Sequence, residues 1–200
     1  MRHSIIYPLL LMMGCVPILK KINGITQPKP VSIPYLIDFA HKNGIGGDNL
    51  VFLSYERAEE IYSKRGFTMQ TARVFDSQGF NIPIDFTADS TTCESHAILL
   101  LIQNIRNLDD YPRSDSITLA SHLAGLVDKN ENPFSIKNLK TADFYVTGDW
   151  ASYLGKINRN RFSLEEEYLK NSGLSISYIK INYDIRKEWG TERLAELGFK

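Results

Sequence analysis

The chain has 200 residues, and its 23 lysines and arginines balance its 23 aspartates and glutamates. This length suits one domain, or one and a half, with an apolar core of its own. Because no run of like charges stands out, the sequence argues against a nucleic-acid partner, which requires clustered basic residues.

Residues 1–14 are predicted to be a signal peptide, because a basic residue precedes an apolar stretch too short to span a bilayer. The segment Met12-Met13-Gly14-Cys15 resembles the lipobox of bacterial lipoproteins, with Met12 in place of the usual leucine. This resemblance implies cleavage before Cys15 and a lipid on that cysteine. The membrane would then be a partner, and the protein would lie in the bacterial cell envelope, where we expect it to face the periplasm. The alternatives are an ordinary apolar N-terminal helix and a signal peptide that is cut elsewhere.

Residues 15–33 are predicted to be a tether between the anchor and the folded body. The stretch from Asn23 to Pro34 contains three prolines and no apolar periodicity, which is typical of an extended spacer. Pro34 suits the first turn of a helix, where its missing N–H has no partner to lose. That helix is expected to end at the glycines between Gly44 and Gly47.

Residues 34–106 are interpreted as an N-terminal half. The apolar run 49–54 predicts a strand, and the helical spacing in 55–65 predicts a helix after it. Residues 71–86 alternate around Asp76-Ser77-Gln78-Gly79, a tight turn, and therefore predict a hairpin. Beyond it, the N-cap residues of 91–94 and the apolar stretch 97–105 predict a buried helix.

Residues 107–200 are interpreted as a C-terminal half, because the polar, turn-rich stretch 107–116 is the best internal boundary. The apolar patterns that follow predict, in order, a helix over 117–127, a strand at 144–146, a helix within 154–170, a strand over 176–183 and a last helix over 184–199.

The most informative stretch of this half runs from Ala142 to Ile157, where a hydrophobic strand leads into Trp150-Ala151-Ser152-Tyr153 and a helix. With its surroundings it resembles the thioredoxin-like superfamily of membrane-anchored thiol–disulfide oxidoreductases and peroxiredoxins. Trp150 and Tyr153 match the aromatic approach to the active-site turn, whereas Leu154 and Ile157 stand where the family has its two cysteines. The resemblance implies an α/β fold, a thioredoxin-like sheet flanked by helices, in which this degenerate redox turn has no thiolate.

Residues 58–79 resemble the later half of the same fold, where a helix ends in Arg-Gly-Phe and a hairpin follows, although Met69 stands near the cis-proline position. Two arrangements are open. The N-terminal half completes the core of the C-terminal half, as in a circular permutation, or two incomplete thioredoxin-like units pack together. We favour the first, because it makes one closed core from this length.

With a lipid on Cys15, Cys93 is the only remaining thiol, so no intramolecular disulfide forms. Cys93 lies at the predicted first turn of a helix, where backbone N–H groups favour a thiolate, and His96 follows three residues later. The other interpretation is that Cys93 is a small buried apolar group. The pair is too small for a metal site, and neither a metal nor a cofactor is predicted.

Other side chains have plain expected roles. His41 and His122 are expected at the surface or the edge of the core, and the acids Glu165 to Glu167 on a solvated helix face. Four aromatic residues either form a binding surface around the degenerate turn or belong to the core; they are Tyr145, Trp150, Tyr153 and Tyr178.

The leading hypothesis is a membrane-anchored envelope lipoprotein whose redox-inactive thioredoxin-like domain binds an envelope protein or another ligand. The missing CxxC argues against enzymatic activity. The alternative is a thiol-dependent oxidoreductase or peroxidase that uses Cys93, with His96 beside it. A third hypothesis, a structural lipoprotein that blocks another protein, is not separated from the first by the sequence.

Overall fold

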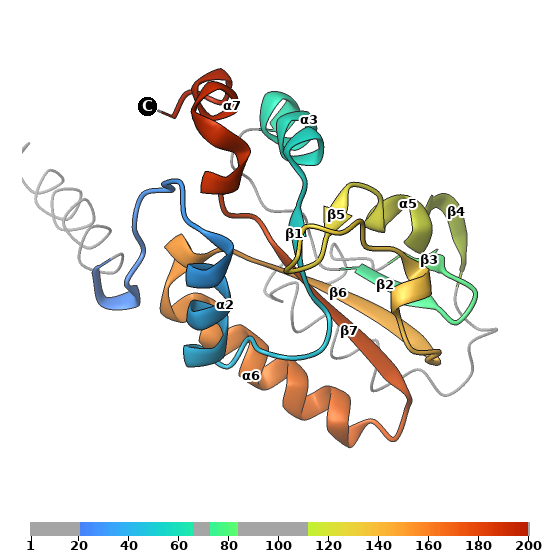
Figure 1. The fold of residues 1–200 in the computed structure, drawn as a ribbon. Coiled ribbons are helices and arrows are strands. Elements are labelled where there is room, and N and C mark those ends of the chain that lie inside the picture. Colours follow the sequence, from blue (N-terminus) through green and yellow to red (C-terminus); the bar gives the residue numbers. More distant parts are fainter. Residues whose placement is uncertain (1–20, 66–72, 84–111, 200) are drawn as a thin grey trace, which may run out of the picture.

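The computed structural model describes residues 21–65, 73–83 and 112–199 (Figure 1). The predicted signal peptide, the predicted lipidation site Cys15 and the helix expected after residue 91 lie outside these ranges. Cys93, His96 and Met69 also lie outside them.

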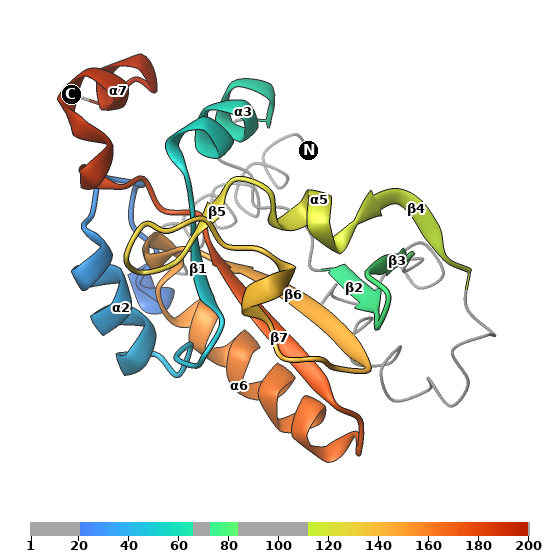
Figure 2. The ribbon, with the colours of Figure 1, turned by 45° about the vertical axis from the view of Figure 1, so that its right-hand side comes forward.

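One seven-stranded mixed sheet forms the centre of the protein, and the predicted α/β class is confirmed (Figures 1 and 2). The middle three strands are parallel and the outer strands pair antiparallel. Across the sheet the order is β4 (Ser114–Thr118), β3 (Phe80–Ile82), β2 (Arg73–Asp76), β6 (Phe144–Trp150), β7 (Ile176–Asn182), β1 (Leu50–Leu53) and β5 (Leu126–Val127).

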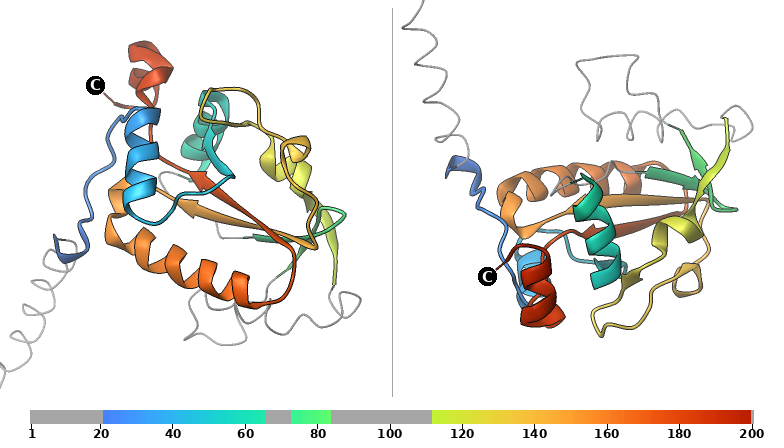
Figure 3. Two further views of the ribbon diagram at one scale, coloured as in Figure 1. Left: turned by 60° about the horizontal axis from the view of Figure 1, so that its bottom comes forward. Right: turned by 90° about the horizontal axis from the view of Figure 1, so that it is seen from above.

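Helices cover both faces of the sheet, and Figure 3 shows strands β6 and β7 between α6 on one side and α3 and α5 on the other. Two buried clusters of apolar side chains follow this division. One combines α2, α6, Phe52 and Trp150, and the other combines α3, α5, Leu53 and Trp189. The helices are α2 (Ile33–Lys42), α3 (Tyr55–Arg65), α5 (Leu119–Leu123), α6 (Lys156–Asn171) and α7 (Gly190–Glu196).

The hairpin predicted around Asp76 is present and lies beside β6 in the same sheet (Figure 2). The Asp76 carboxylate accepts hydrogen bonds from the backbone N–H groups of Gln78, at 3.0 Å, and Phe80, at 2.9 Å. Gly79 has a φ of 84°, which an L side chain rarely adopts, and so closes the turn. Arg73 through Asp76 then pair with Thr147 through Phe144, which joins segments from both halves of the sequence in one core.

The helix starts are as expected from local chemistry. Ser32 is the N-cap of α2, its hydroxyl accepting from the N–H of Tyr35 at 3.4 Å, and Pro34 lies in the first turn. Ile33, Leu36 and Ala40 form the buried side of this helix. Helix α3 spans the predicted residues, and β1 before it completes the predicted β-α step.

The helix predicted over residues 117–127 is wrong in extent. Helix α5 has only five residues, because Gly125 adopts a φ of 76° and breaks it. Leu126 and Val127 then pair with β1 as strand β5, so their apolar side chains are buried by strand pairing. Within the predicted boundary at 107–116, Ser114 already begins edge strand β4. The last predicted helix is also shorter, since Gly190–Glu196 follows a 3₁₀ turn at Lys187–Trp189.

Candidate functional site

The segment predicted to be a degenerate redox turn lies at the carboxyl end of β6 and is called the degenerate turn below. After Trp150 the chain forms a 3₁₀ turn at Ser152–Leu154, passes through Gly155 at a φ of 56°, and enters α6. The strand, turn and helix predicted here are therefore confirmed. Because β6, β7 and β1 are parallel, their carboxyl ends meet at this edge of the sheet, where α/β proteins commonly bind ligands.

A buried carboxyl group holds this turn from the neighbouring strand. Asp184, two residues beyond β7, accepts hydrogen bonds from the N–H of Ser152, at 2.6 Å, and its hydroxyl, at 2.7 Å. The side-chain amide of Asn182 donates a third, at 2.8 Å. Burial raises the pKa of Asp184 above its usual value, although the bonds from Ser152 and Asn182 oppose that shift. The turn is thus fixed by a carboxyl group and two donor residues.

A second buried polar side chain fixes the turn from the helix. The Asn158 amide on α6 donates to the carbonyl oxygens of Ala151, at 2.7 Å, and Gly155, at 3.3 Å. Below the turn, burial and the nearby Asp149 raise the pKa of Tyr183 far above its usual value. Both tyrosine and aspartate are buried, so this end of the sheet has a polar interior.

The predicted turn residues occupy different environments. Trp150 is fully buried and stacks on Phe39 of α2, with ring centroids 6.2 Å apart. Tyr153 and Leu154 are half-buried and pack against the apolar cluster of α3 and α5. Ile157 is 42% exposed on α6. A packing role at the strand–helix junction therefore holds for Leu154 and not for Ile157.

The predicted tether lies against this turn. The N–H of Thr26 donates to the carbonyl oxygen of Tyr153 at 2.8 Å. Further along, Val31 is buried and exchanges backbone hydrogen bonds with Ile185 and Lys187, each at 2.9 Å. The described part of the tether is consequently attached to the domain and closes the turn from outside.

We expect Gly155→Ala to detach this segment. A Cβ at Gly155 would lie 2.6 Å from the carbonyl oxygen of Gly24, and the positive φ adds strain. The hydrogen bond from Thr26 to Tyr153 should then be lost, while the sheet stays intact. Limited proteolysis should cut the segment 21–30 several times faster than in the wild type.

Gly173→Ala is the matched control, because Gly173 also has a positive φ, of 73°, but a Cβ there meets nothing within 4 Å. It should lose a similar amount of stability through backbone strain without exposing the segment to protease. Equal protection of the segment in both variants would contradict the prediction.

The remaining aromatic candidates do not form one surface. Tyr145 is buried in the cluster of α3 and α5, whereas Trp150 is buried in that of α2 and α6, on the opposite face. Tyr178 packs against the second cluster and Tyr153 against the first. Of the two expectations for these aromatic residues, a place in the core therefore fits Tyr145 and Trp150 best.

Two of the expected surface groups are less exposed than predicted. Glu166 is half-buried and forms an ion pair with the buried ammonium of Lys180, so the solvated face predicted for the acids of α6 does not extend to it. Lys180 also donates to the carbonyl oxygen of Gly46 at 2.5 Å. His41 is exposed, as one of the two expected roles requires, whereas His122 is buried.

Among the described residues, three cavities lie outside the turn. One of about 570 Å³ is lined by Lys180, Glu166 and Tyr178 among others, and Lys180 and Glu166 already pair with each other. A second, of about 580 Å³, lies between α2 and the loop around Lys129. The third, of about 250 Å³, lies between α3, α5 and β2 and contains His122.

The sequence did not identify Asp184, Asn182 and Asn158 as site residues. A signal was present, because Asn182 and Asp184 flank the end of an apolar strand, where side chains of parallel sheets meet. Nothing in the sequence pairs either residue with Ser152, some thirty positions earlier.

Among the described residues, no group of three or more His, Cys, Asp or Glu side chains could hold a metal ion. Within the same ranges, every helix is too short or too polar to cross a membrane. In comparisons with known proteins, no family model, no curated protein and no solved structure matches this chain.

Proposed function

We propose that this protein is a lipid-anchored protein of the bacterial envelope whose thioredoxin-like domain lacks dithiol chemistry and binds a partner protein or another ligand. The proposal joins the lipobox at Cys15 to the turn at Ser152–Leu154.

The pairing of the strands supports a circularly permuted thioredoxin-like core. This interpretation requires the N-terminal hairpin to lie in one sheet with the strands on either side of the degenerate turn. Strand β2 pairs antiparallel with β6, and β6 pairs parallel with β7, so the hairpin and both strands share one sheet. Separate sheets would have contradicted the permutation.

The observation that carries the proposal is the closed, sulfur-free turn. Leu154 is half-buried, and neither it nor Ile157 can form a thiolate. Asp184 and Asn158 hold the turn from inside, and Thr26 covers it from outside. These contacts favour a structural and binding role for the turn over exchange of electrons with a substrate.

A dithiol-dependent assay tests the absence of redox chemistry. Purified protein is expected to leave the reduction of insulin by dithiothreitol at the uncatalysed rate, with a CxxC thioredoxin as the positive control. Turnover that persists in Cys93→Ser would contradict the proposal. Turnover that is lost in Cys93→Ser would support the alternative thiol enzyme.

The membrane anchor is tested separately by labelling with a radioactive fatty acid in a bacterial host. Label is expected in the wild-type protein and not in Cys15→Ser, because only the cysteine after the lipobox would accept the lipid. Cys93→Ser is the matched control and should keep the label. Equal incorporation into Cys15→Ser would exclude lipidation at Cys15.

A further inference from the structure

The smallest of the three cavities has an unusual lining. It lies between α3, α5 and β2, measures about 250 Å³, and is here called the basic cavity. Its charged residues comprise three cations and a single acid. The lining consists of Arg57, Glu60, Ile61, Lys64, Arg73, Ile117, Ser121 and His122.

Two buried nitrogen atoms of this lining have no hydrogen-bond partner in the structure, Nε2 of His122 and Nε of Arg73. His122 is only 5% exposed, and buried polar groups normally find a partner, since an unmade hydrogen bond costs about 1–3 kcal/mol. Nε of Arg73 is a donor, and Nε2 of His122 is a donor in the tautomer that carries the proton there. In that tautomer, a ligand that accepts hydrogen bonds would satisfy both nitrogen atoms.

The charges of the basic cavity favour an anion. Burial, together with the positive charges of Arg73 and Arg57, lowers the pKa of His122 to about 4. The imidazole is therefore neutral at pH 7 and adds no positive charge to that of the arginines. A partly buried guanidinium group without a counter-charge is unfavourable, and its planar donors match the oxygen atoms of an oxyanion.

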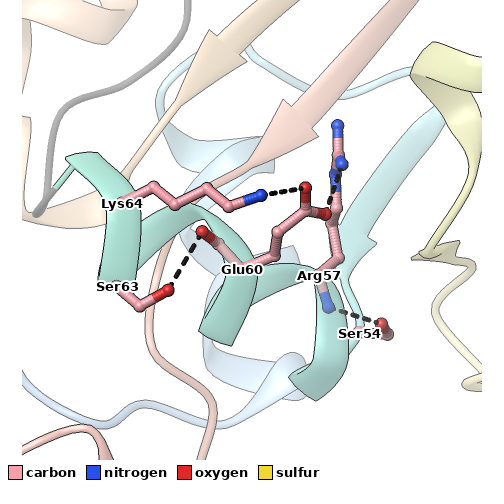
Figure 4. A network of polar contacts seen from close by, with 5 residues as sticks. All are labelled: Ser54, Arg57, Glu60, Ser63 and Lys64. Atoms are coloured by element: carbon pink, nitrogen blue, oxygen red, sulfur yellow. Dashed lines mark hydrogen bonds and ion pairs between the residues drawn. The ribbon is translucent and has the colours of Figure 1, made fainter.

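Glu60, the acid of the basic cavity, does not neutralise the positive charge of the cavity. Glu60 pairs with Arg57 at 2.8 Å and with Lys64 at 3.1 Å, and Figure 4 shows both side chains directed at its carboxylate. The side chains of Lys64 and Glu60 are 68% and 47% exposed, so solvent weakens this pair and an anion can compete for the cations. The ion-pair partners of Glu60 among the described residues are Arg57 and Lys64, and Arg73 is not one of them.

The position of Arg57 is fixed before any ligand arrives. Its N–H donates to the Ser54 hydroxyl at 3.2 Å, at the start of α3 (Figure 4). Its Cβ and Cγ lie against Gly125, where a Cβ would approach them to 2.9 and 3.3 Å. Gly125 thus lets the arginine stem cross the chain between α5 and β5.

We propose that the basic cavity binds a small oxyanion of the phosphate or sulfate type, held by Arg57 and Arg73 with the imidazole of His122 as a further donor. The inference does not rest on the function proposed above, because the basic cavity lies away from the degenerate turn and uses none of its residues.

The test is a titration of inorganic phosphate into the full-length protein at constant ionic strength, followed through the imidazole NMR signals of His122. A saturable shift of the His122 signal is expected, and its pKa should rise above about 4, because a nearby anion favours the imidazolium form. The exposed His41 should not respond. The absence of a saturable shift would overturn the proposal.

Variants locate the site. Arg73→Gln should weaken phosphate binding about ten-fold or more, since it removes a charge-assisted donor. Lys64→Gln, at an exposed position that does not endanger folding, should weaken it about two- to five-fold. Lys140→Gln removes an equal charge far outside the cavity, at a side chain 90% exposed, and should leave the affinity unchanged. Equal effects of Lys64→Gln and Lys140→Gln would show unspecific charge attraction and overturn the proposal.

A second arm separates a free oxyanion from a lipid headgroup. Vesicles with an anionic phospholipid are added in place of phosphate, again with wild type and Arg73→Gln. No response of the His122 signal to vesicles is expected, because the cavity, at about 250 Å³, is small. A His122 response to vesicles without any response to phosphate would overturn the assignment to a free oxyanion.

Discussion

Trp150→Ala is expected to lower the free energy of unfolding by about 3–5 kcal/mol. Trp150 is fully buried at the end of β6, where its ring stacks on Phe39 at an interplanar angle of 4° and packs among α2, α6 and Phe52. Removing the indole leaves a cavity between the sheet and α2. Neither β6, which is paired on both sides, nor α2, which is capped by Ser32, can move far enough to fill it. Urea unfolding followed by circular dichroism measures the loss.

Trp150→Phe is the informative partner of this variant. The indole Nε1 of Trp150 has no hydrogen-bond partner, so the substitution by phenylalanine reduces the buried apolar area without breaking a hydrogen bond. We expect a loss of about 1–2 kcal/mol. Ile157→Ala, on the exposed side of the same junction, should change the stability by less than about 0.5 kcal/mol. A Trp150→Ala loss no larger than that of Ile157→Ala would contradict the packing described here.

Asp184→Ala is expected to destabilise the protein by about 2–4 kcal/mol, because it leaves the part-buried donors of Ser152 and the buried amide of Asn182 without their acceptor. Asp184→Asn keeps an acceptor oxygen for these donors and should cost about 1 kcal/mol or less at pH 7. Urea unfolding of the three proteins measures both values. A smaller loss in Asp184→Ala than in Asp184→Asn would contradict the role assigned to this carboxyl group.

The same pair predicts a pH dependence. The pKa of Asp184 is raised in the folded state, so folding favours the protonated carboxyl group. Its contribution to stability is fully present below the unfolded pKa of about 3.9 and is lost as the pH rises through the folded value. The stability of the wild type relative to Asp184→Asn should therefore fall from pH 4 toward neutral pH. A rise over that interval would show that the carboxylate, rather than the acid, is the form preferred by the fold.

The sequence predicts those parts of this fold whose signals are local. The β1-α3 step, the Asp76 hairpin and the run from β6 through the turn into α6 each combine an apolar pattern with a cap or a turn residue. The helix expected over 117–127 fails, because pairing with β1 outweighs the helical spacing of Leu126 and Val127. Apolar periodicity alone cannot distinguish a short helix followed by a strand from one longer helix.

The candidate site is less accessible to sequence reasoning, because its contacts join distant positions. From the sequence, Ser152 is one residue of the predicted turn, and the pairing of β6 with β7 is what brings its partner Asp184 beside it. The proline-rich segment before α2 has the composition of a spacer, yet backbone hydrogen bonds from Thr26 and Val31, which depend on no particular side chain, attach it to the domain.

If Cys15 carries a lipid, as proposed above, the hydrogen bond from Thr26 to Tyr153 would also limit the distance of the domain from the bilayer. With a lipid on Cys15, the segment that joins the lipid to the domain would end at Thr26, eleven residues later, and not at the start of α2. Fully extended, a linker from Cys15 to Thr26 reaches about 40 Å at most, whereas a linker from Cys15 to Ser32 would reach about 60 Å. The degenerate turn would then face the membrane, and a partner would meet the protein close to the lipid surface.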